Sequence, residues 1–219
     1  MIGASQPNLV PLRASDIAYG QLREMVLDLR LAPGEILNEH SLAATLQLGR
    51  MPVREAIARL VSDRFILVLP RRGTVVAPMT MANVADLFEA REAVECGMAY
   101  IAARKVTDQQ ISDLKVLVKE ADAARDVSDV ERFLLDDLHI HQFLVRQMDN
   151  PLLQDMAERL VLHNLRFWRS FFRTRAPQAD AMVSHSQLLA ALEARDSEGA
   201  EAAMRAHIVA SRQLLQSLF

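Results

Sequence analysis

The chain has 219 residues, 51 % of them hydrophobic, which is enough for two small domains with packed cores. Its one cysteine, Cys96, excludes an internal disulfide, and the lack of a secretory signal or of any run near about 18 uncharged apolar residues predicts a cytoplasmic protein without a membrane partner. The net charge of −3 gives no general support for nucleic-acid binding, but residues 1–79 carry nine arginines against seven acidic residues and the remainder is acidic.

Residues 1–14 are expected to form a flexible arm, because they contain two prolines and show little hydrophobic periodicity. A helix is predicted to begin near Ser15, which is an N-cap candidate. The Ala-Pro-Gly sequence at residues 32–34 should end that helix, and a second helix is predicted from about Asn38.

A third helix is predicted to run to about Asp63, and two β-prone runs follow it at residues 65–69 and 74–77. The Pro-Arg-Arg-Gly sequence at residues 70–73 has the composition of a hairpin turn. Three helices and a hairpin predict a winged helix-turn-helix over residues 15–78, which is a DNA-binding fold.

Residues 80–219 are expected to form an all-helical bundle, so the fold class is mainly α, with an N-terminal winged helix-turn-helix. The chain shows helix breaks at polar or proline-containing junctions, such as Asn150-Pro151. Six helices are predicted, at about residues 81–104, 107–125, 128–148, 150–173, 179–195 and 197–217.

Two arginines are the first candidates for reading DNA. Arg50 and Arg54 are four residues apart, on the side of the third helix opposite the apolar positions Val53, Ile57 and Leu60. The second helix of a helix-turn-helix presents its N-terminal residues to base edges, and an arginine fork can bind guanine O6 and N7 together. The alternative is a solvated face of an amphipathic helix.

The hairpin supplies a second basic group. Arg71, Arg72 and the backbone of Gly73 lie at the predicted tip, where they could meet phosphate or the adjacent minor groove. The ordered series of helix, turn, helix, turn, arginine-rich helix and Arg-Arg-Gly hairpin favours DNA binding over the solvated alternative.

The rear half contains polar residues on stripes that should face inward. Asp137 and His141 are four apart on one helical face, and His185 and His207 lie among apolar neighbours. Buried polar side chains need partners, so these residues satisfy one another or something bound. Three imidazoles and a carboxylate suit a divalent ion, Zn²⁺ first, with Ni²⁺ or Mn²⁺ as further candidates. Hydrogen-bonded core histidines are the alternative.

Four short stretches of the front half follow a known pattern. They are Leu31-Ala32-Pro33-Gly34-Glu35-Ile36-Leu37, Ser41-Leu42-Ala43-Ala44, Arg50-Met51-Pro52-Val53-Arg54-Glu55-Ala56 and Arg71-Arg72-Gly73. On these residues the segment from about residue 17 to 78 resembles the winged-helix domain of GntR-type bacterial transcription regulators. The resemblance implies that Arg50 and Arg54 read bases and that Gly73 approaches the minor groove. Met51 is included among these predicted DNA contacts. The family usually has Ser or Thr where Gly49 stands and Thr where Met51 stands, so the preferred operator sequence stays open.

A second pattern covers the rear half. Asp137-Leu138-His139-Ile140-His141 lies nine residues before Asn150-Pro151-Leu152-Leu153, and His185 and His207 follow in their own short motifs. These residues resemble the ligand-binding FCD domain of the FadR-like branch of GntR regulators. The resemblance selects His141 rather than His139 and implies that Asp137, His141, His185 and His207 hold a metal ion near which a small organic acid, often a carboxylate, binds. Six rear helices resemble the shorter, VanR-like subgroup.

Two more inward-facing residues are candidates for binding the effector. Arg91, four residues before Glu95, stands where the family often has an arginine, and its fork suits a carboxylate. A structural salt bridge with Glu95 is the alternative. His163 lies on an apolar stripe and is expected either to line the pocket or to be an ordinary core histidine.

Taken together, these features predict a transcription regulator, a repressor, that binds a palindromic operator in double-stranded DNA as a homodimer. A small organic-acid effector bound near the divalent metal ion would control its operator affinity. Two alternatives stay open. One is a metal-dependent hydrolase-like helical domain. The other is a constitutive DNA-binding protein with a purely structural metal.

Overall fold

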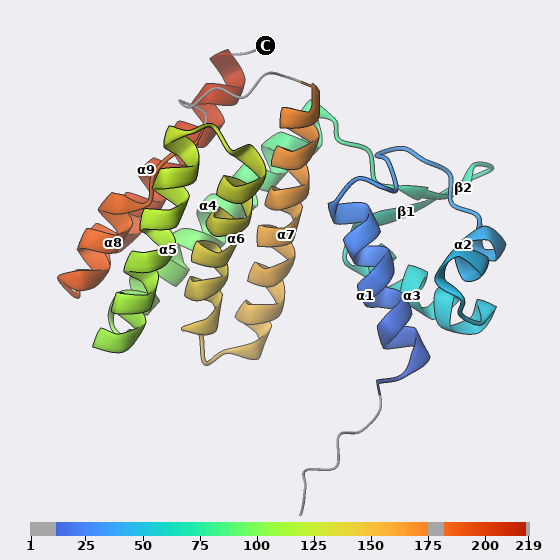
Figure 1. The fold of residues 1–219 in the computed structure, drawn as a ribbon, viewed down its shortest axis with the longest axis horizontal. Coiled ribbons are helices and arrows are strands. Elements are labelled where there is room, and N and C mark those ends of the chain that lie inside the picture. The colour runs from blue at the N-terminus through green and yellow to red at the C-terminus, as the bar shows by residue number, and fades with distance from the viewer. Residues whose placement is uncertain (1–11, 175–181, 218–219) are drawn as a thin grey trace, which may run out of the picture. The chain divides into compact units, whose positions relative to one another are not determined.

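The computed structural model describes residues 12–174 and 182–217 (Figure 1). The chain divides into two compact units, Met1–Pro78 and Met79–Phe219. The arm predicted for residues 1–14 lies outside the described residues except for its last three, and Ala14 already belongs to the first helix.

The front unit contains the three helices and the antiparallel hairpin that the sequence predicts. Its core is formed by apolar residues of the first and third helices, including Leu22, Val26, Val53 and Leu60, which are fully buried. The elements are α1 (Ala14–Leu27), α2 (Glu39–Leu46), α3 (Arg50–Ser62), β1 (Ile66–Leu69) and β2 (Gly73–Val76).

The predicted start of the second helix near Asn38 is confirmed. Asn38 caps α2, because its side-chain oxygen accepts hydrogen bonds from the backbone N–H groups of His40 and Ser41 at 2.9 and 3.0 Å. The prediction for Ser15 is wrong: Arg13 occupies the N-cap position of α1 without a side-chain cap, and Ser15 lies inside the first turn. α1 is held instead by its packing on α3.

The hairpin has a third, unpredicted neighbour. β1 and β2 pair from Ile66 opposite Val76 to Leu69 opposite Gly73. On the other side of β2, the N–H of Leu37 donates to the carbonyl of Thr74 at 2.8 Å, and residues 34–37 run beside the strand. The Pro-Gly turn therefore does more than end a helix, because it adds a pairing segment to β2.

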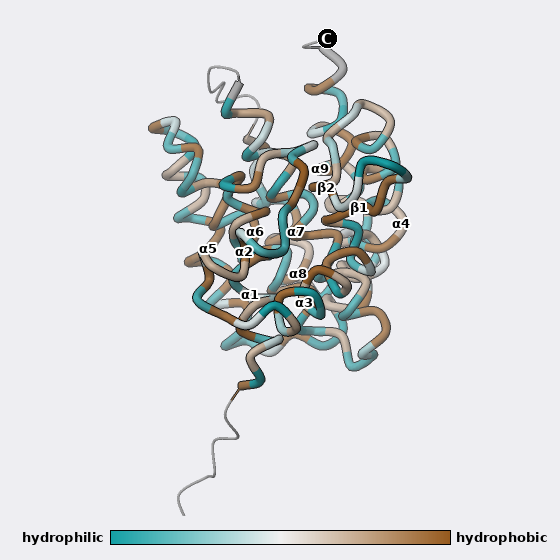
Figure 2. Tube along the Cα trace, turned by 90° about the vertical axis from the view of Figure 1, so that its right-hand side faces the viewer, coloured by the Kyte–Doolittle hydropathy of each residue, from teal (hydrophilic) through white to brown (hydrophobic). Residues whose placement is uncertain are grey.

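The rear unit is a bundle of six helices over its described residues, as the sequence predicts. α4 packs most extensively on α9, and α6 packs between α5 and α7. Figure 2 shows hydrophobic and hydrophilic stretches alternating along the helices, which is the pattern that buries one side of each. The helices are α4 (Met81–Ala103), α5 (Asp108–Asp126), α6 (Val130–Arg146), α7 (Pro151–Thr174), α8 (Ser186–Glu193) and α9 (Ser197–Ser217).

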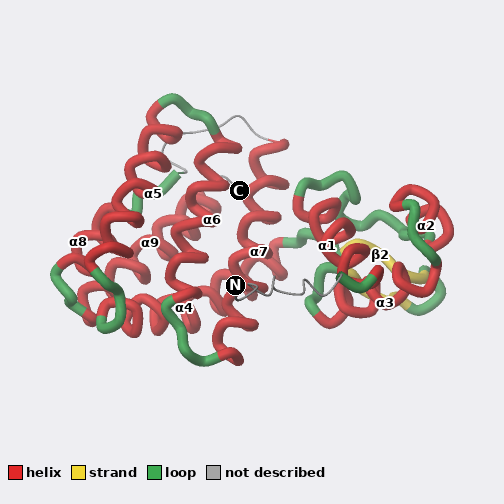
Figure 3. Tube along the Cα trace, turned by 60° about the horizontal axis from the view of Figure 1, so that its bottom comes forward, coloured by secondary structure: helices red, strands yellow, loops and turns green. Residues whose placement is uncertain are grey.

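The helix predicted at residues 179–195 begins later than expected. Residues 182–185 are not helical, α8 starts at Ser186, and His185 occupies its N-cap position (Figure 3, loops in green). The Ser184 hydroxyl accepts a hydrogen bond from the N–H of Ser186 at 3.1 Å, which is the local bonding by which serine competes with helix. Residues 179–181 of the prediction lie outside the described residues.

Among the helices that the structure describes, none is both long enough and apolar enough to cross a membrane.

Candidate functional site

The structure brings the four predicted metal ligands together inside the rear unit. Asp137 and His141 come from α6, His185 from the residue before α8, and His207 from α9. All four side chains are buried, and one possible ligand atom from each lies within 4.8 Å of the others. They form a buried cluster that is compatible with a metal ion.

The side-chain nitrogens and the carboxylate converge on a small volume. Nε2 of His185 lies 3.2 Å from Nε2 of His141 and 3.5 Å from Oδ1 of Asp137. The rings of His185 and His207 are 4.0 Å apart, centre to centre. Among the described residues, the buried Nδ1 atoms of His185 and His207 have no hydrogen-bond partner. Buried polar atoms without partners are costly, and three imidazoles gathered with one carboxylate are a ligand set that fits a divalent transition metal.

The charges in the cluster are set by burial and by neighbouring groups. Burial opposes ionisation of Asp137, but the nearby His141 outweighs it and lowers the carboxyl pKa to about 2. Burial favours neutral His141, but Glu95 and Asp137 raise its pKa to about 9. Burial lowers the pKa of His185 to about 4 and that of His207 well below its usual value. At neutral pH the metal-free cluster therefore presents one carboxylate and two neutral imidazoles, which are the ligand forms of these groups, together with a protonated His141 that must lose its proton to bind a metal ion.

A buried ion pair on α4 supports His141. Nε of Arg91 donates to Oε1 of Glu95 at 2.8 Å, and both side chains are fully buried. The other oxygen of Glu95 lies 2.6 Å from Nδ1 of His141. Burial would raise the pKa of Glu95, but Arg91 and His141 hold it well below its usual range. A carboxylate behind a ligating histidine fixes the direction of its ring, so Glu95 orients the nitrogen that faces the cluster.

The structural salt bridge between Arg91 and Glu95, which was the alternative to an effector contact, is thus present. Arg91 also donates from Nη1 to Oδ1 of Asn164 on α7 at 2.8 Å, and its Nη2 lies 3.5 Å from Nε2 of His141. The sequence spacing suggested the Glu95 partner, whereas the contact of Glu95 with His141 and the role of Asn164 depend on helix packing. No local pattern indicates either of them.

A small cavity lies beside the cluster. His163, predicted as a possible pocket residue, is half-buried on α7 and is not among its lining residues, whereas its neighbour Asn164 is. The lining combines aromatic side chains with polar groups of the cluster and includes Asp137, Asn164, Trp168, Phe172, His207 and Ser211. The mixture of apolar wall and few polar groups resembles that of small-molecule sites, but the cavity has an empty volume of only about 270 Å³, so an organic acid would have to displace side chains to enter.

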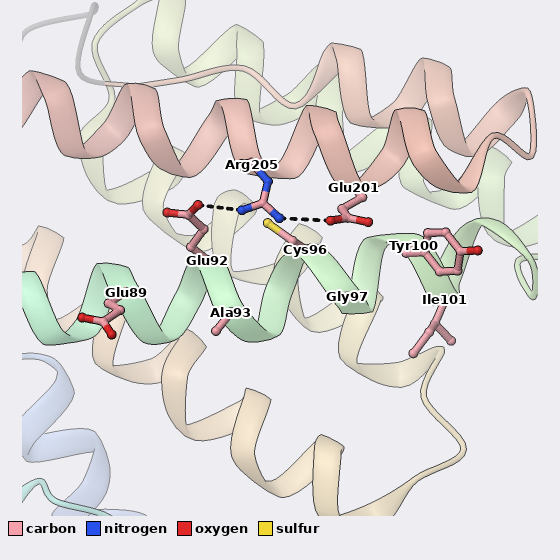
Figure 4. A pocket seen from close by; sticks show the side chains of 9 residues that line it. All are labelled: Glu89, Glu92, Ala93, Cys96, Gly97, Tyr100, Ile101, Glu201 and Arg205. Carbon is pink, nitrogen blue, oxygen red and sulfur yellow. Dashed lines mark hydrogen bonds and ion pairs between the residues drawn. The ribbon is translucent and has the colours of Figure 1, made fainter.

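Another hollow lies between α4 and α9 and is open to solvent (Figure 4). Arg205 on α9 bridges across it to Glu92 on α4 at 2.6 Å and also pairs with Glu201 on its own helix at 3.0 Å. None of the residues predicted to bind DNA, metal or effector lines this hollow.

The thiol of Cys96 points into the same region but is buried, and burial raises its pKa to about 11. The thiolate is the reactive form, so we expect iodoacetamide at pH 8 to alkylate Cys96 slowly in the native protein and quickly in urea. Mass spectrometry of timed samples measures both rates. Equal rates in the two states would contradict the buried, inert thiol.

The predicted DNA contacts of α3 lie on the exposed side of that helix. Arg50 is its first residue and Arg54 lies one turn later, and both are exposed. Met51, which lies between the two arginines in the sequence, is a large apolar side chain that is 61 % exposed. The apolar side of α3 is buried, as the sequence pattern predicts.

The predicted wing is equally accessible. Arg71 and Arg72 are exposed in the turn between β1 and β2, and Gly73 begins β2 with a φ of 80°. Such a positive φ suits glycine, because a Cβ would be strained there. The front unit thus exposes arginines both at the start of α3 and at the tip of the hairpin.

Arg54 forms an ion pair with Glu39. Its Nε and Nη2 donate to Oε2 of Glu39, the first residue of α2, at 3.1 and 3.0 Å. These bonds use one edge of the planar guanidinium, and the Nη1–Nη2 edge faces away from Glu39. Glu39 was not identified from the sequence, because the contact joins two helices across fifteen residues.

Comparison with known proteins gives both halves of the chain a family. Residues 14–76 match the family of bacterial regulatory proteins called the gntR family, and residues 86–210 match the FCD domain. The transcriptional repressor RspR of Escherichia coli (strain K12) is 30 % identical over 190 residues, covering 87 % of this chain and 83 % of the relative. The repressor GlaR of the same organism is 26 % identical over 208 residues, covering 90 % and 94 %.

Solved structures share the fold. E. coli McbR/YncC superposes with a TM-score of 0.80 at 22 % identity, covering 95 % of this chain and 99 % of the other. A GntR-type regulator from Rhodococcus sp. RHA1 gives 0.69 at 25 % identity, covering 93 % and 98 %. Because these families regulate transcription and are not enzymes, the hydrolase alternative does not hold. The chain belongs to the GntR family of DNA-binding transcription regulators, in the FadR-like branch whose rear half is an FCD domain.

Proposed function

We propose that this regulator is a repressor that binds a palindromic operator as a homodimer and releases it when a small organic acid binds beside a divalent metal ion. The observation that carries the proposal is the buried cluster of Asp137, His141, His185 and His207 next to a small cavity. Repression is supported by two relatives, RspR and GlaR, which are both described as repressors.

The four cluster residues would hold the metal ion, with Zn²⁺ the first candidate and Ni²⁺ or Mn²⁺ the next. Bound there, the ion would supply a positive charge that attracts a carboxylate. Asp137 is ionised and His185 and His207 are neutral at pH 7, whereas His141, whose pKa is raised to about 9, would release a proton when the ion binds. Glu95 would keep the His141 ring directed at the ion.

Arg91 and His163 are the effector contacts expected from the sequence, but neither lines the cavity beside the cluster, so each would reach an effector there only if the surrounding side chains rearranged. The guanidinium of Arg91 is bonded to Glu95 and Asn164, so an incoming carboxylate would have to share or displace those bonds. Asn164 lines the cavity and donates or accepts through its amide, which makes it a further polar contact for the effector.

The effector signal would reach the DNA-binding unit through α4. This helix carries Arg91 and Glu95 and begins at Met81, five residues after β2 ends at Val76. An effector that binds one arrangement of the helical unit better than another shifts the balance between them. Coupling of this kind typically changes affinity about 5- to 150-fold.

The proposal is tested with purified protein, elemental analysis and a panel of organic acids. We expect about one equivalent of a transition metal per chain and at least one acid that both raises the melting temperature and weakens operator binding. Operator duplexes are obtained by selecting random DNA with the protein itself. If no acid changes either quantity in metal-loaded protein, the sensor function is wrong.

A purely structural metal is the second candidate, because complete burial of all four ligands is also typical of structural ions. Removing the metal with a chelator separates the two. Collapse of the circular dichroism signal favours the structural ion. A folded, metal-free protein that has lost its response to the acid favours the sensor.

Glu39 is expected to tune DNA reading through Arg54. In the Glu39→Gln variant, Arg54 loses its charged partner and gains freedom to meet phosphates, so non-specific affinity should rise and base discrimination at one position should fall. Selection from random duplexes compares the two proteins directly. Asp16→Asn is the matched control, because it removes an ion pair with Arg59 on the same helix. Identical base preferences in Glu39→Gln and the parent protein would contradict this role.

A further inference from the structure

His185 differs from the other three members of the cluster in how the chain holds it. Asp137 and His141 lie within α6 and His207 lies within α9, so regular helix fixes their backbones. His185 occupies the N-cap position of α8 with φ −98° and ψ 13°, and residues 182–184 before it are not helical. Its ring is buried, but the direction from which it enters the cluster depends on contacts of this short segment.

The Ser184 hydroxyl makes such contacts on both sides of His185. It donates to Oδ2 of Asp122 on α5 at 3.1 Å and accepts from the N–H of Ser186 at 3.1 Å. A hydroxyl has one proton to donate, so the bond to Asp122 also fixes its rotor. The hydroxyl oxygen of Ser184 thus connects the residues immediately before and after His185, and its hydrogen bond to Asp122 connects them to α5.

Asp122 is itself held in place. Its other oxygen, Oδ1, accepts a hydrogen bond from Nη1 of Arg125, one turn along α5, at 2.8 Å. Both side chains of this pair are more than a quarter exposed, and ion pairs of that kind contribute little to the stability of the fold. The consequence of the arrangement therefore lies in position: Arg125 holds one oxygen of the carboxylate, and the other oxygen accepts the hydrogen bond from Ser184.

We propose that Asp122, oriented by Arg125, is a positioning residue for the metal centre, and that it acts through the Ser184 hydroxyl to set His185. The inference rests on the proposed metal site. Hydrogen bonds behind a metal ligand typically change metal affinity about 10- to 100-fold, although they make no contact with the ion. Asp122 and Ser184 are expected to have this effect with little change in the fold.

The test measures Zn²⁺ affinity of the full chain by competition with a chromophoric chelator. Asp122→Ala and Ser184→Ala are each expected to weaken binding about 10- to 100-fold, and Ser184→Thr, which keeps the hydroxyl, is expected to restore most of it. Lys115→Met is the matched control, because Lys115 pairs with Glu193 and so joins the same two helices, α5 and α8, without touching residues 182–186. It should bind Zn²⁺ as the parent protein does.

The absorption spectrum of bound Co²⁺ is a second measurement, and it would not change if Asp122 and Ser184 only stabilised the fold. The visible absorption of bound Co²⁺ reports ligand geometry, and the two alanine variants should show altered absorption bands. In the metal-free state, both variants should have the same melting temperature as the parent protein. Because Ser184→Ala removes a single oxygen, it keeps the test valid if Asp122→Ala folds poorly.

Parent-like affinity and spectra in both alanine variants would overturn the inference and leave the metal site standing. An equal loss in Lys115→Met would overturn it as well, since general docking of α5 on α8 would then be the cause. Failure of the parent protein to bind Zn²⁺, Ni²⁺, Mn²⁺ or Co²⁺ would overturn the proposed metal function itself.

Discussion

Replacing His207 by alanine is expected to lower metal affinity at least about 100-fold and to abolish the response to the organic acid, while the protein still folds. A four-ligand zinc site binds with roughly 10–16 kcal/mol of apparent free energy, so the loss of one ligand removes a few kcal/mol. His207 is buried on α9 and neutral at pH 7, so the alanine variant loses no ion pair of its own. Its cost to the fold is that of a cavity, about 2–4 kcal/mol.

The matched control is His139→Ala. His139 lies on α6 between the two cluster residues of that helix but is exposed, and the sequence register also places it outside the site. Metal content by elemental analysis and melting temperature with and without metal compare the variants. Full metal occupancy in His207→Ala, or an equal loss in His139→Ala, would contradict the assignment of the four ligands.

Arginine substitutions on α3 should produce the largest effects on DNA binding. Arg50→Ala and Arg54→Ala are each expected to cost about 1–3 kcal/mol of operator affinity, which is about 5- to 150-fold, and to relax the preference for one base. Both side chains are exposed and opposite the buried side of the helix, so the loss should not come from unfolding. Binding titrations against selected operator duplexes and single-base variants measure both effects.

A wing arginine should behave differently. Arg72→Ala is expected to weaken binding to all duplexes about equally and to lower the salt dependence by about one phosphate contact. Arg30→Ala is the charge-matched control, because Arg30 is exposed in the same unit but pairs with Asp28, away from α3 and the hairpin. Loss of base preference in Arg72→Ala, or unchanged operator affinity in Arg50→Ala and Arg54→Ala, would contradict the division between base reading and phosphate contact.

Local patterns in the sequence predicted those parts of the fold that depend on near neighbours. Hydrophobic periodicity located the three front helices, and two β-prone runs around a turn sequence located the hairpin. The second helix starts near Asn38 as predicted, and Asn38 caps it through bonds that reach only two and three residues along the chain. The prediction of Ser15 as an N-cap was wrong because the packing of α1 on α3 overrides a weak local signal. The pairing of residues 34–37 with β2 was missed because it joins segments forty residues apart.

In the buried cluster, too, local patterns predicted contacts between near neighbours but not contacts between distant segments. Helical spacing places Asp137 and His141 on one face of α6, and apolar neighbours indicated that His185 and His207 also face inward. The resemblance to FCD domains then favoured a shared metal site over separate hydrogen-bonded histidines. The helix predicted at residues 179–195 included His185, whereas α8 begins at Ser186, after a segment in which the Ser184 hydroxyl bonds the backbone. The contact of Glu95 with His141 depends on how α4 packs on α6, which no short motif specifies.

The most direct test of the account is operator affinity measured at one salt concentration in four states: metal-loaded and metal-free protein, each with and without an acid that raises the melting temperature. The account predicts that the acid weakens operator binding about 5- to 150-fold in the metal-loaded protein and has no effect in the metal-free protein. An operator affinity that is the same in all four states, in protein that remains folded, would contradict it.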